Sequence, residues 1–274
     1  MKLGIVVRTM GPQSTRETIT ECARAAEDAG LDDLWVPDHV AIAPDDAEGS
    51  GGRYLDPLAV LAFLSGITSN IGLATGVLIL PYRPPLPTAK WVATIQELSA
   101  GRLRLGVGVG WLDSEFRALG VEKSARGRLT DDALEFLRRC FDGDDVEENG
   151  QKFLFRPRPA RPPIYVGGAP PHALERAVRY GDGWIPMGGS PERLREPIER
   201  LRELAAVKGA APPEVIVMTG LPLDEPGRAA ETLLAFQAVG ASGIVHGARY
   251  ADAAEFRKGA EVLGGDVRAL LSRP

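Results

Sequence analysis

Short apolar segments alternate with amphipathic segments along the whole of this chain, and this alternation restricts the folds that it can adopt. The apolar segments lack a polar side, as strands of a parallel sheet covered on both faces do. The segments between them carry apolar residues at the helical spacing of three and four. Expected strands are residues 3–7, 34–37, 71–80, 102–107, 164–166, 184–186, 215–218 and 244–245, and expected helices are 16–29, 56–68, 88–98, 127–141, 173–180, 191–207, 228–239 and 253–263.

Eight strand–helix pairs in a chain of 274 residues predict an α/β fold, a (β/α)8 TIM barrel that forms a single domain over residues 1–274. A doubly wound open sheet is the alternative, but it usually has fewer strands. One segment, residues 142–163, departs from the alternation. It contains Asn149-Gly150, the strongest short signal for a β-hairpin. We therefore expect a small hairpin excursion there, not a linker between domains.

In a barrel of this type the active site lies at the carboxyl ends of the strands. The fourth expected strand carries Gly106, Gly108 and Gly110 just before Trp111. Trp111 stands where the dinucleotide-binding fingerprint has its third glycine, so that fingerprint is absent. The alternate glycines allow two interpretations: a bare strand face on which a flat ligand lies, or a buried strand packed closely on its neighbour. Because acid–base residues are few at the strand ends, the site suits a ligand that brings its own chemistry.

Asp38 and His39 are an adjacent acid and imidazole at a strand end. Successive strand side chains point to opposite faces, so one should face the pocket and the other the rim. In the functional interpretation, one contacts a cofactor and the other moves a proton near neutral pH. In the structural interpretation, Asp38 caps the next segment and His39 packs on Trp35 or the rim. Residues 41–53, rich in Asp and Gly, follow and are expected to form a lid loop.

Gly167, Gly168 and Ala169 end the fifth expected strand, and a helix starts after two prolines. Free backbone N–H groups at a helix start attract anions, so this turn is the predicted phosphate site. An ordinary strand–helix turn is the alternative. Arg126 or Arg128 could add a charge-assisted contact.

The remaining titratable residues carry weaker signals. Arg8 and Arg83 follow strands and are further candidate anion contacts. His246 ends the last strand and either faces the pocket or is held by a polar partner. Cys22 and Cys140 lie far apart on expected helices, which predicts two buried thiols and no disulfide. No strand end carries His and carboxylates at the spacing of metal ligands, so no metal is expected.

The charge of the chain argues against two classes of partner. Lys plus Arg is 32 and Asp plus Glu is 37, so the formal net charge is −5. A mildly acidic chain has no general attraction for nucleic acid or an anionic membrane surface. The longest apolar run, residues 71–81, is too short to span a membrane. With no signal-peptide pattern after Met1, we expect a cytoplasmic protein.

Six short motifs occur in order along the chain. They are PDH (37–39), ATGVLILPYRPP (74–85), GVGVGW (106–111) with EF downstream (115–116), RGRLTDD (126–132), PPIYVGG (162–168) and GDGWIP (181–186). Together they resemble the bacterial luciferase-like family, and more narrowly its branch of oxidoreductases that depend on the deazaflavin coenzyme F420. Each motif alone is weak, but six in this order are specific to the family.

The resemblance implies a flavin or deazaflavin over the strand ends of the barrel. It implies that Asp38 contacts the ring system, that His39 transfers a proton, and that a bulge in the third strand, often with a non-prolyl cis peptide, backs the ring. Family members are often dimers, so a homodimer is expected. The predicted catalytic residue is His39, and the predicted cofactor-binding residues are Asp38, Thr75, Gly76, Val77, Gly108, Val109, Gly110, Trp111, Ser114, Gly167, Gly168 and Ala169.

Three departures from the family pattern bear on the substrate. Trp111 stands where sugar-phosphate dehydrogenases of the family place a catalytic glutamate, and Ser114 where they place an asparagine. Gly76 replaces a serine found in several members. These departures argue against sugar-phosphate dehydrogenation.

The expected function is hydride transfer between coenzyme F420 and a small organic substrate. The first alternative is an FMN-dependent monooxygenase that uses dioxygen, because FMN shares the ring and phosphate contacts. The second is a flavin- or deazaflavin-binding protein without turnover. The longer anionic tail of the deazaflavin favours basic residues along its path, which Arg83, Arg126 and Arg128 would supply.

Overall fold

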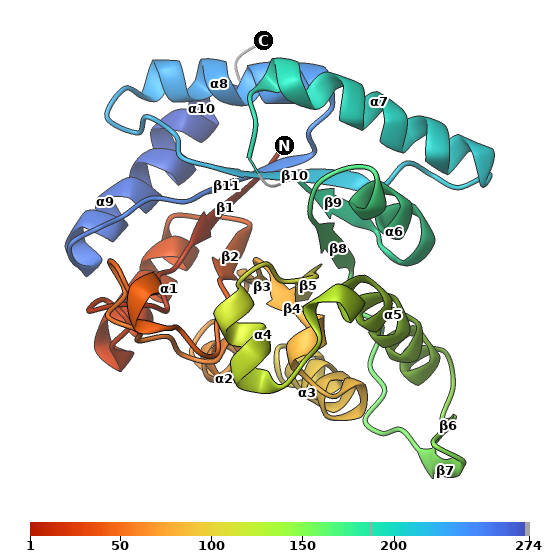
Figure 1. Cartoon of the computed structure of the whole chain (residues 1–274). Helices are drawn as coiled ribbons and strands as arrows, with labels where there is room; N and C mark the ends of the chain where they lie inside the picture. The colour runs from red at the N-terminus through yellow and green to blue at the C-terminus, as the bar shows by residue number, and fades with distance from the viewer. Residues whose placement is uncertain (187, 272–274) are drawn as a thin grey trace.

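The computed structural model describes residues 1–186 and 188–271 of the chain. Eight parallel strands form a closed ring in the order β1–β2–β3–β5–β8–β9–β10–β11, with β11 paired to β1. Figure 1 shows the strands around the centre and the helices outside them. The predicted (β/α)8 barrel is confirmed. The barrel strands are β1 (Lys2–Val6), β2 (Asp33–Val36), β3 (Gly72–Thr75), β5 (Leu103–Gly108), β8 (Ile164–Gly167), β9 (Gly183–Ile185), β10 (Glu214–Thr219) and β11 (Gly243–His246).

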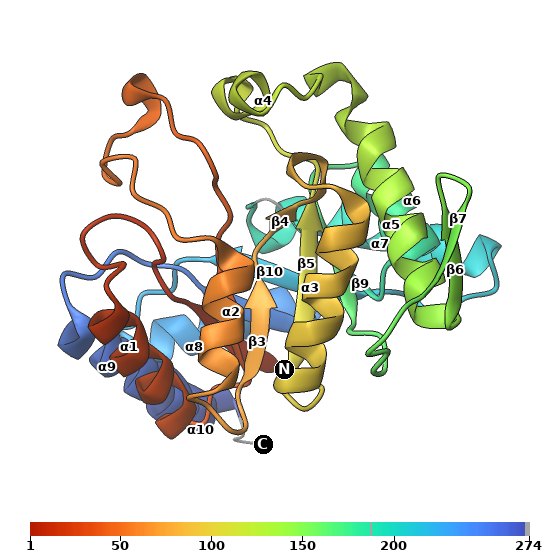
Figure 2. The ribbon, with the colours of Figure 1, turned by 90° about the horizontal axis from the view of Figure 1, so that it is seen from below.

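The helices follow the expected order, with two short additions, α4 (Asp113–Leu119) and the carboxyl-terminal α10 (Arg268–Leu271). Helix α4 lies between β5 and α5, on the side where the strands end (Figure 2). Helix α3 begins at Pro85 and not at residue 88 as expected, because proline is tolerated in the first turn of a helix. The other helices are α1 (Arg16–Asp28), α2 (Pro57–Ser65), α3 (Pro85–Leu98), α5 (Arg126–Asp142), α6 (His172–Tyr180), α7 (Pro191–Val207), α8 (Pro226–Val239) and α9 (Ala253–Val262).

The predicted hairpin excursion is also confirmed. Strands β6 (Asp145–Glu148) and β7 (Gln151–Leu154) pair antiparallel around Asn149 and Gly150. Both turn residues have positive φ, as the tightest hairpin turns require. The hairpin extends from the barrel beside α5 (Figure 2) and takes no part in the ring of strands.

Two apolar layers hold the barrel together. Alternate strand residues point inward or outward, so Trp35 belongs to the cluster inside the barrel while its neighbours Leu34 and Val36 pack against the helices. Cys22 and Cys140 are both buried and free, as predicted. Burial raises the pKa of Cys140 to about 11 and that of Cys22 to about 12, so both stay protonated thiols.

The third strand is interrupted, as the sequence indicated at Thr75-Gly76. Strand β3 ends at Thr75, the Gly76–Val77 peptide is cis, and the chain resumes as β4 (Leu78–Ile79). The Thr75 hydroxyl donates a hydrogen bond of 2.6 Å to the carbonyl oxygen of Gly106 on β5. The bulge is therefore fastened to the strand that carries the alternate glycines.

This contact corrects one interpretation of those glycines. A Cβ added at Gly106 would lie 2.0 Å from the carbonyl oxygen of Thr75, and one at Gly108 would lie 2.5 Å from Cγ2 of Val77. The space at both positions is filled by the bulge and is not a bare face for a flat ligand. Close packing on a neighbouring segment, the other interpretation, holds there.

We expect Gly106→Ala to lower the free energy of unfolding by about 2 kcal/mol, a usual cost of overpacking a rigid site. The atom that the new methyl group meets is a backbone oxygen, which cannot rotate away. Urea denaturation of the variant measures the loss. Gly143→Ala is the matched control, because nothing lies within 4 Å of its added Cβ. Equal transition midpoints for the two variants would contradict the packing argument.

Candidate active site

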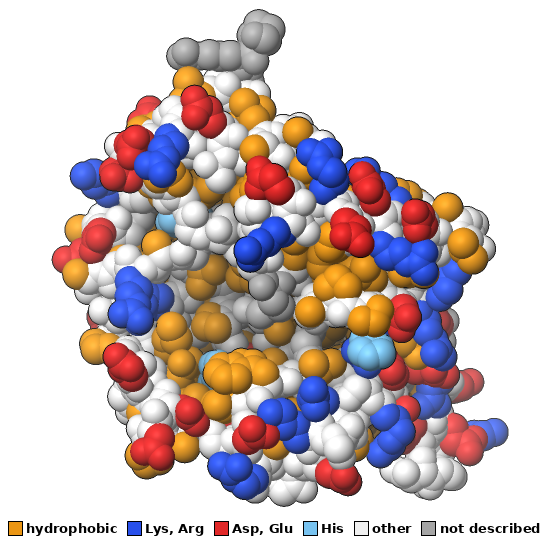
Figure 3. All heavy atoms as spheres, turned by 45° about the horizontal axis from the view of Figure 1, so that its top comes forward, with side chains coloured by type: hydrophobic (Ala, Val, Ile, Leu, Met, Phe, Trp, Pro, Cys, Tyr) orange, Lys and Arg blue, Asp and Glu red, His pale blue; other side chains and the backbone are white. Residues whose placement is uncertain are grey.

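The carboxyl ends of the strands surround a hollow lined largely by hydrophobic side chains (Figure 3). Val6, Val77 and Met218 pack on the inner barrel cluster and remain partly exposed at this end. A Cβ at Gly76 would lie 2.8 Å from Cε of Met218 and 3.1 Å from the Trp35 ring. A side chain at position 76 would therefore meet Met218 and Trp35, which already occupy that space.

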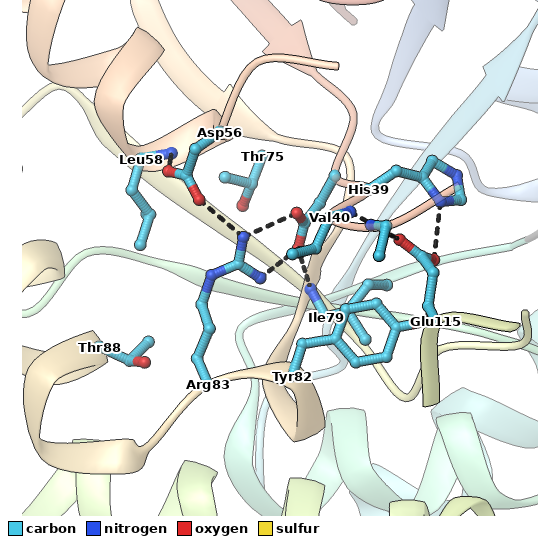
Figure 4. A network of polar contacts seen from close by, with 12 residues as sticks. His39, Val40, Asp56, Leu58, Thr75, Ile79, Tyr82, Arg83, Thr88 and Glu115 are labelled. Carbon is cyan, nitrogen blue, oxygen red and sulfur yellow. Dashed lines mark hydrogen bonds and ion pairs between the residues drawn. The ribbon is translucent and has the colours of Figure 1, made fainter. Parts of the chain in front are cut away.

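His39 lies just beyond the carboxyl end of β2 and is held there by Glu115. Its Nδ1 lies 2.9 Å from Oε2 of Glu115, which follows 76 residues later in the chain, in the first turn of α4 (Figure 4). The His39 ring also makes edge contacts with Tyr54 and Trp111, at centroid distances of 4.9 and 6.3 Å. The carboxylate selects the tautomer with a proton on Nδ1, which leaves Nε2 free to exchange a proton.

Glu115 is fully buried, and its carboxylate binds three further groups besides His39. Its Oε1 accepts hydrogen bonds from the backbone N–H groups of Val40 (2.6 Å) and Ala41 (3.1 Å), and its Oε2 also accepts one from the Tyr82 hydroxyl (3.0 Å). Burial alone would raise the pKa of Glu115, but the hydrogen bonds from Val40, His39 and Ala41 outweigh it and lower that pKa. The stabilisation by Glu115 is thus present above the usual carboxyl pKa and is lost as the pH falls through the lowered value.

Asp38 and His39 lie just beyond the end of β2 and bind different partners. The Asp38 side chain is fully buried and forms a two-pronged ion pair with Arg83, at 2.6 and 2.8 Å. It also accepts a hydrogen bond of 2.8 Å from the Ile79 N–H, so it fastens β4 to the end of β2. Arg83 makes a further ion pair of 2.9 Å with Asp56, the N-cap of α2. Arg83 is thus bound within the protein, and contact of Asp38 with a cofactor stays a prediction.

A cavity lies at the end of β8, where the sequence predicts the phosphate site. The turn residues Gly168 and Ala169 line one side, and Arg126, Arg128 and Arg176 line the others. The turn offers fewer amides than expected. The Gly168 N–H already donates to the Ile185 carbonyl, and the two prolines that follow carry none. Arginine side chains therefore supply most of the positive charge around this cavity.

The remaining predicted residues lie on or near the loop after β5. Val109 lines the cavity just described, beside Gly167. Gly110 has a φ of 78°, and an added Cβ would lie 2.8 Å from Ile79. The Trp111 ring is 67% exposed above His39. The hydroxyl of Ser114 donates a hydrogen bond of 2.9 Å to Asp46 in the predicted lid loop, so α4 holds this loop at two points.

Glu115 is not among the site residues predicted from the sequence, where it appears only within the EF motif (115–116). The structure places it at the centre of the His39 contacts. The available signal was an acid in the first turn after a strand end, which is also typical of an ordinary helix start.

His246 is buried and its Nδ1 accepts a hydrogen bond of 3.0 Å from the Leu221 N–H. Burial lowers its pKa to about 4, so the ring is neutral at physiological pH. Within residues 1–186 and 188–271, no three His, Cys, Asp or Glu side chains are grouped so that they could hold a metal ion. In the same part of the chain, the helices are too short or too polar to cross a membrane.

A (β/α)8 barrel with an imidazole–carboxylate pair and a basic cavity at the strand ends has the features of an enzyme site that binds an anionic ligand. A profile of the luciferase-like monooxygenase family matches residues 1–266. The chain therefore belongs to this family, as its motifs indicated, and it is an oxidoreductase.

Two mycobacterial proteins are among its relatives. An uncharacterized protein of Mycobacterium tuberculosis is 32% identical over 223 residues, 74% of this chain and 77% of that protein. The F420-dependent hydroxymycolic acid dehydrogenase of the same organism is 31% identical over 192 residues, 66% of this chain and 52% of the enzyme.

Solved structures share the whole fold. An F420-dependent secondary alcohol dehydrogenase, in complex with an F420–acetone adduct, has a TM-score of 0.81 and 16% identity over 99% of both chains. The oxygenating constituent of a 3,6-diketocamphane monooxygenase from Pseudomonas putida, in complex with FMN, has a TM-score of 0.80 and 15% identity over 100% of both. At these identities the likeness shows the fold alone.

Proposed function

We propose that this protein transfers a hydride between coenzyme F420 and a small organic substrate. The observation that carries the proposal is the basic cavity at the end of β8, on the same side of the barrel as the apolar hollow and the His39–Glu115 pair. The F420-dependent hydroxymycolic acid dehydrogenase, an enzyme relative at 31% identity, supports the deazaflavin over FMN.

The residues of the chain fit such a cofactor. Arg126, Arg128 and Arg176 surround space enough for a phosphate and an anionic tail, and arginine is well suited to bind both. Val77 and Met218 offer an apolar backing for a flat ring. When bound, F420 supplies the hydride chemistry through its deazaflavin ring.

The protein's own part in the reaction is orientation and proton transfer. His39 gives a proton to the substrate, or takes one from it, through Nε2, while Glu115 holds Nδ1–H and stabilises the charged imidazole. The loop of residues 41–53, held through Val40, Ala41 and Asp46, limits access of water to the hollow. The homodimer and the cytoplasmic location stay predictions from the sequence.

Titration of the purified protein with oxidised F420 and, separately, with FMN tests the cofactor, with fluorescence as the readout. We expect saturable binding of F420 and much weaker binding of FMN. Binding of FMN alone would favour a monooxygenase, and the substrate screen would then follow oxygen consumption. If neither binds at micromolar concentrations, the cofactor assignment is wrong.

Arg126→Met is expected to weaken F420 binding about tenfold, the effect of losing one charge-assisted contact. Arg228→Met is the matched control, because Arg228 forms an exposed ion pair with Glu225 at the start of α8, away from this cavity. Equal affinities of the two variants would contradict a role of the cavity in phosphate binding.

A further inference from the structure

Arg8 is a buried cation without a partner for its charge. Its residue is 9% exposed, and its Nε is buried with no hydrogen-bond partner. Among residues 1–186 and 188–271, no carboxylate forms an ion pair with it, and its side chain makes no hydrogen bond. An unpaired buried charge strongly destabilises a fold. A buried, unpaired guanidinium at the wall of a cavity is typical of a site that binds an anion.

Arg8 lines a cavity whose walls also include Gly49, Tyr250 and Glu255, and a second arginine lines this cavity too. Arg249, in the loop after β11, is exposed and forms no ion pair with the described part of the chain. Its Nη2 comes within 3.8 Å of a Cβ placed at Gly49, so it reaches the predicted lid loop. The cavity has one acid, Glu255, and one of its oxygens already accepts the Ala251 N–H at 2.7 Å. Two free guanidinium groups thus face one carboxylate.

An adjoining cavity indicates the chemical character of the rest of the molecule that carries the anionic group. It shares Arg249, Tyr250 and Glu255 with the first, and its other walls are mostly apolar, including Leu221 and Phe256. Its volume is about 300 Å³, at the lower limit of sites that bind small molecules. The pair of cavities matches a small molecule with an apolar body and one oxyanion group.

The anion is not the cofactor phosphate. Arg8 follows β1, whereas the cavity proposed for the cofactor follows β8. In the closed ring β1–β2–β3–β5–β8–β9–β10–β11, these two strands are four positions apart and therefore lie opposite each other (Figure 1). We infer that Arg8 and Arg249 bind an oxyanion group of the substrate, so that the substrate is a small amphipathic acid. The identification of the bound acid as the substrate rests on the proposed function, whereas the anion-binding site itself does not.

Calorimetric titration with octanoate and with octanamide tests the inference, because the two probes share a shape and differ in charge. We expect octanoate to bind the wild-type protein at least tenfold more tightly than octanamide. Arg8→Met should abolish this preference, and Arg126→Met, on the cofactor side, should keep it. Equal binding of the two probes, or a preference that survives in Arg8→Met, would overturn the assignment.

Two further readouts separate this site from a structural role and from the cofactor. Because Arg8 has no partner to lose, Arg8→Met should unfold at a temperature equal to or above that of the wild type. A fall of several degrees would indicate a structural role and overturn the inference. F420 binding should be unchanged in Arg8→Met, and its loss would assign the anion to the cofactor. A wild type that binds octanoate selectively but no deazaflavin would overturn the proposed function and leave the anion site standing.

Discussion

His39→Ala is expected to lower kcat for F420-dependent turnover by about 10²–10⁴-fold, the usual contribution of a positioned acid–base group. The Nε2 of His39 is free, while its Nδ1 is held 2.9 Å from Glu115. Cofactor affinity should change little, because the basic cavity at the end of β8 is separate from this imidazole. Steady-state kinetics with any substrate that the wild type turns over, together with an F420 titration, measure both quantities.

Two further variants, Glu115→Gln and Tyr54→Phe, test whether the fall in kcat of His39→Ala reflects proton transfer by an oriented imidazole. Glutamine keeps an oxygen for the Val40 and Ala41 amides but presents an amide nitrogen to His39, which favours the tautomer with a proton on Nε2. We expect kcat to fall about 10²-fold or more, as for other carboxylates that orient a catalytic imidazole. Tyr54→Phe keeps the ring contact with His39 and should retain activity. Full activity of His39→Ala would place the proton transfer elsewhere.

Arg83→Met is expected to lower the free energy of unfolding by about 3–5 kcal/mol, the cost of leaving a buried charge unpaired. The Asp38 side chain is 0% exposed and keeps, after the substitution, one hydrogen bond from the Ile79 N–H. The loss should be greatest where Asp38 is ionised. Urea denaturation at neutral pH measures it.

Asp56→Asn is the matched control for Arg83. The Asp56 side chain is 49% exposed, so its ion pair with Arg83 is worth at most about 1 kcal/mol. Asparagine also keeps the N-cap of α2, which Asp56 makes to Leu58 and Ala59. The double variant Asp38→Asn/Arg83→Met should recover part of the loss, because no buried charge then remains. A double variant no more stable than Arg83→Met would contradict this account.

Most of the fold could be predicted from the sequence because its signals are local. Apolar strands and amphipathic helices repeat at spacings that need no knowledge of distant residues. The split of the third strand was visible at Thr75-Gly76, and the hairpin at Asn149-Gly150. The differences were the short added helices and the ends of elements such as α3, whose first turn consists of residues that occur equally often in loops.

The candidate site could be predicted only in part. The position of His39 at a strand end followed from the order of elements, and the cavity beside Gly168 from the turn after β8. Its partner Glu115 did not, because the 75 residues between Val40 and Glu115 carry no local sign of their contact. Asp38 and Arg83 both looked like ligand contacts, although they bind each other.

The sequence by itself determined the barrel, the family and the strand ends at which the chemistry lies, because hydrophobic periodicity and short motifs are properties of neighbouring residues. Only the tertiary structure decided which charges neutralise one another. It paired Asp38 with Arg83 and His39 with Glu115, and it left the buried side chain of Arg8 without a partner among residues 1–186 and 188–271. Such pairings depend on distances of a few ångströms between segments far apart in the chain, and Coulomb and hydrogen-bond energies fall off too steeply for sequence order to indicate them.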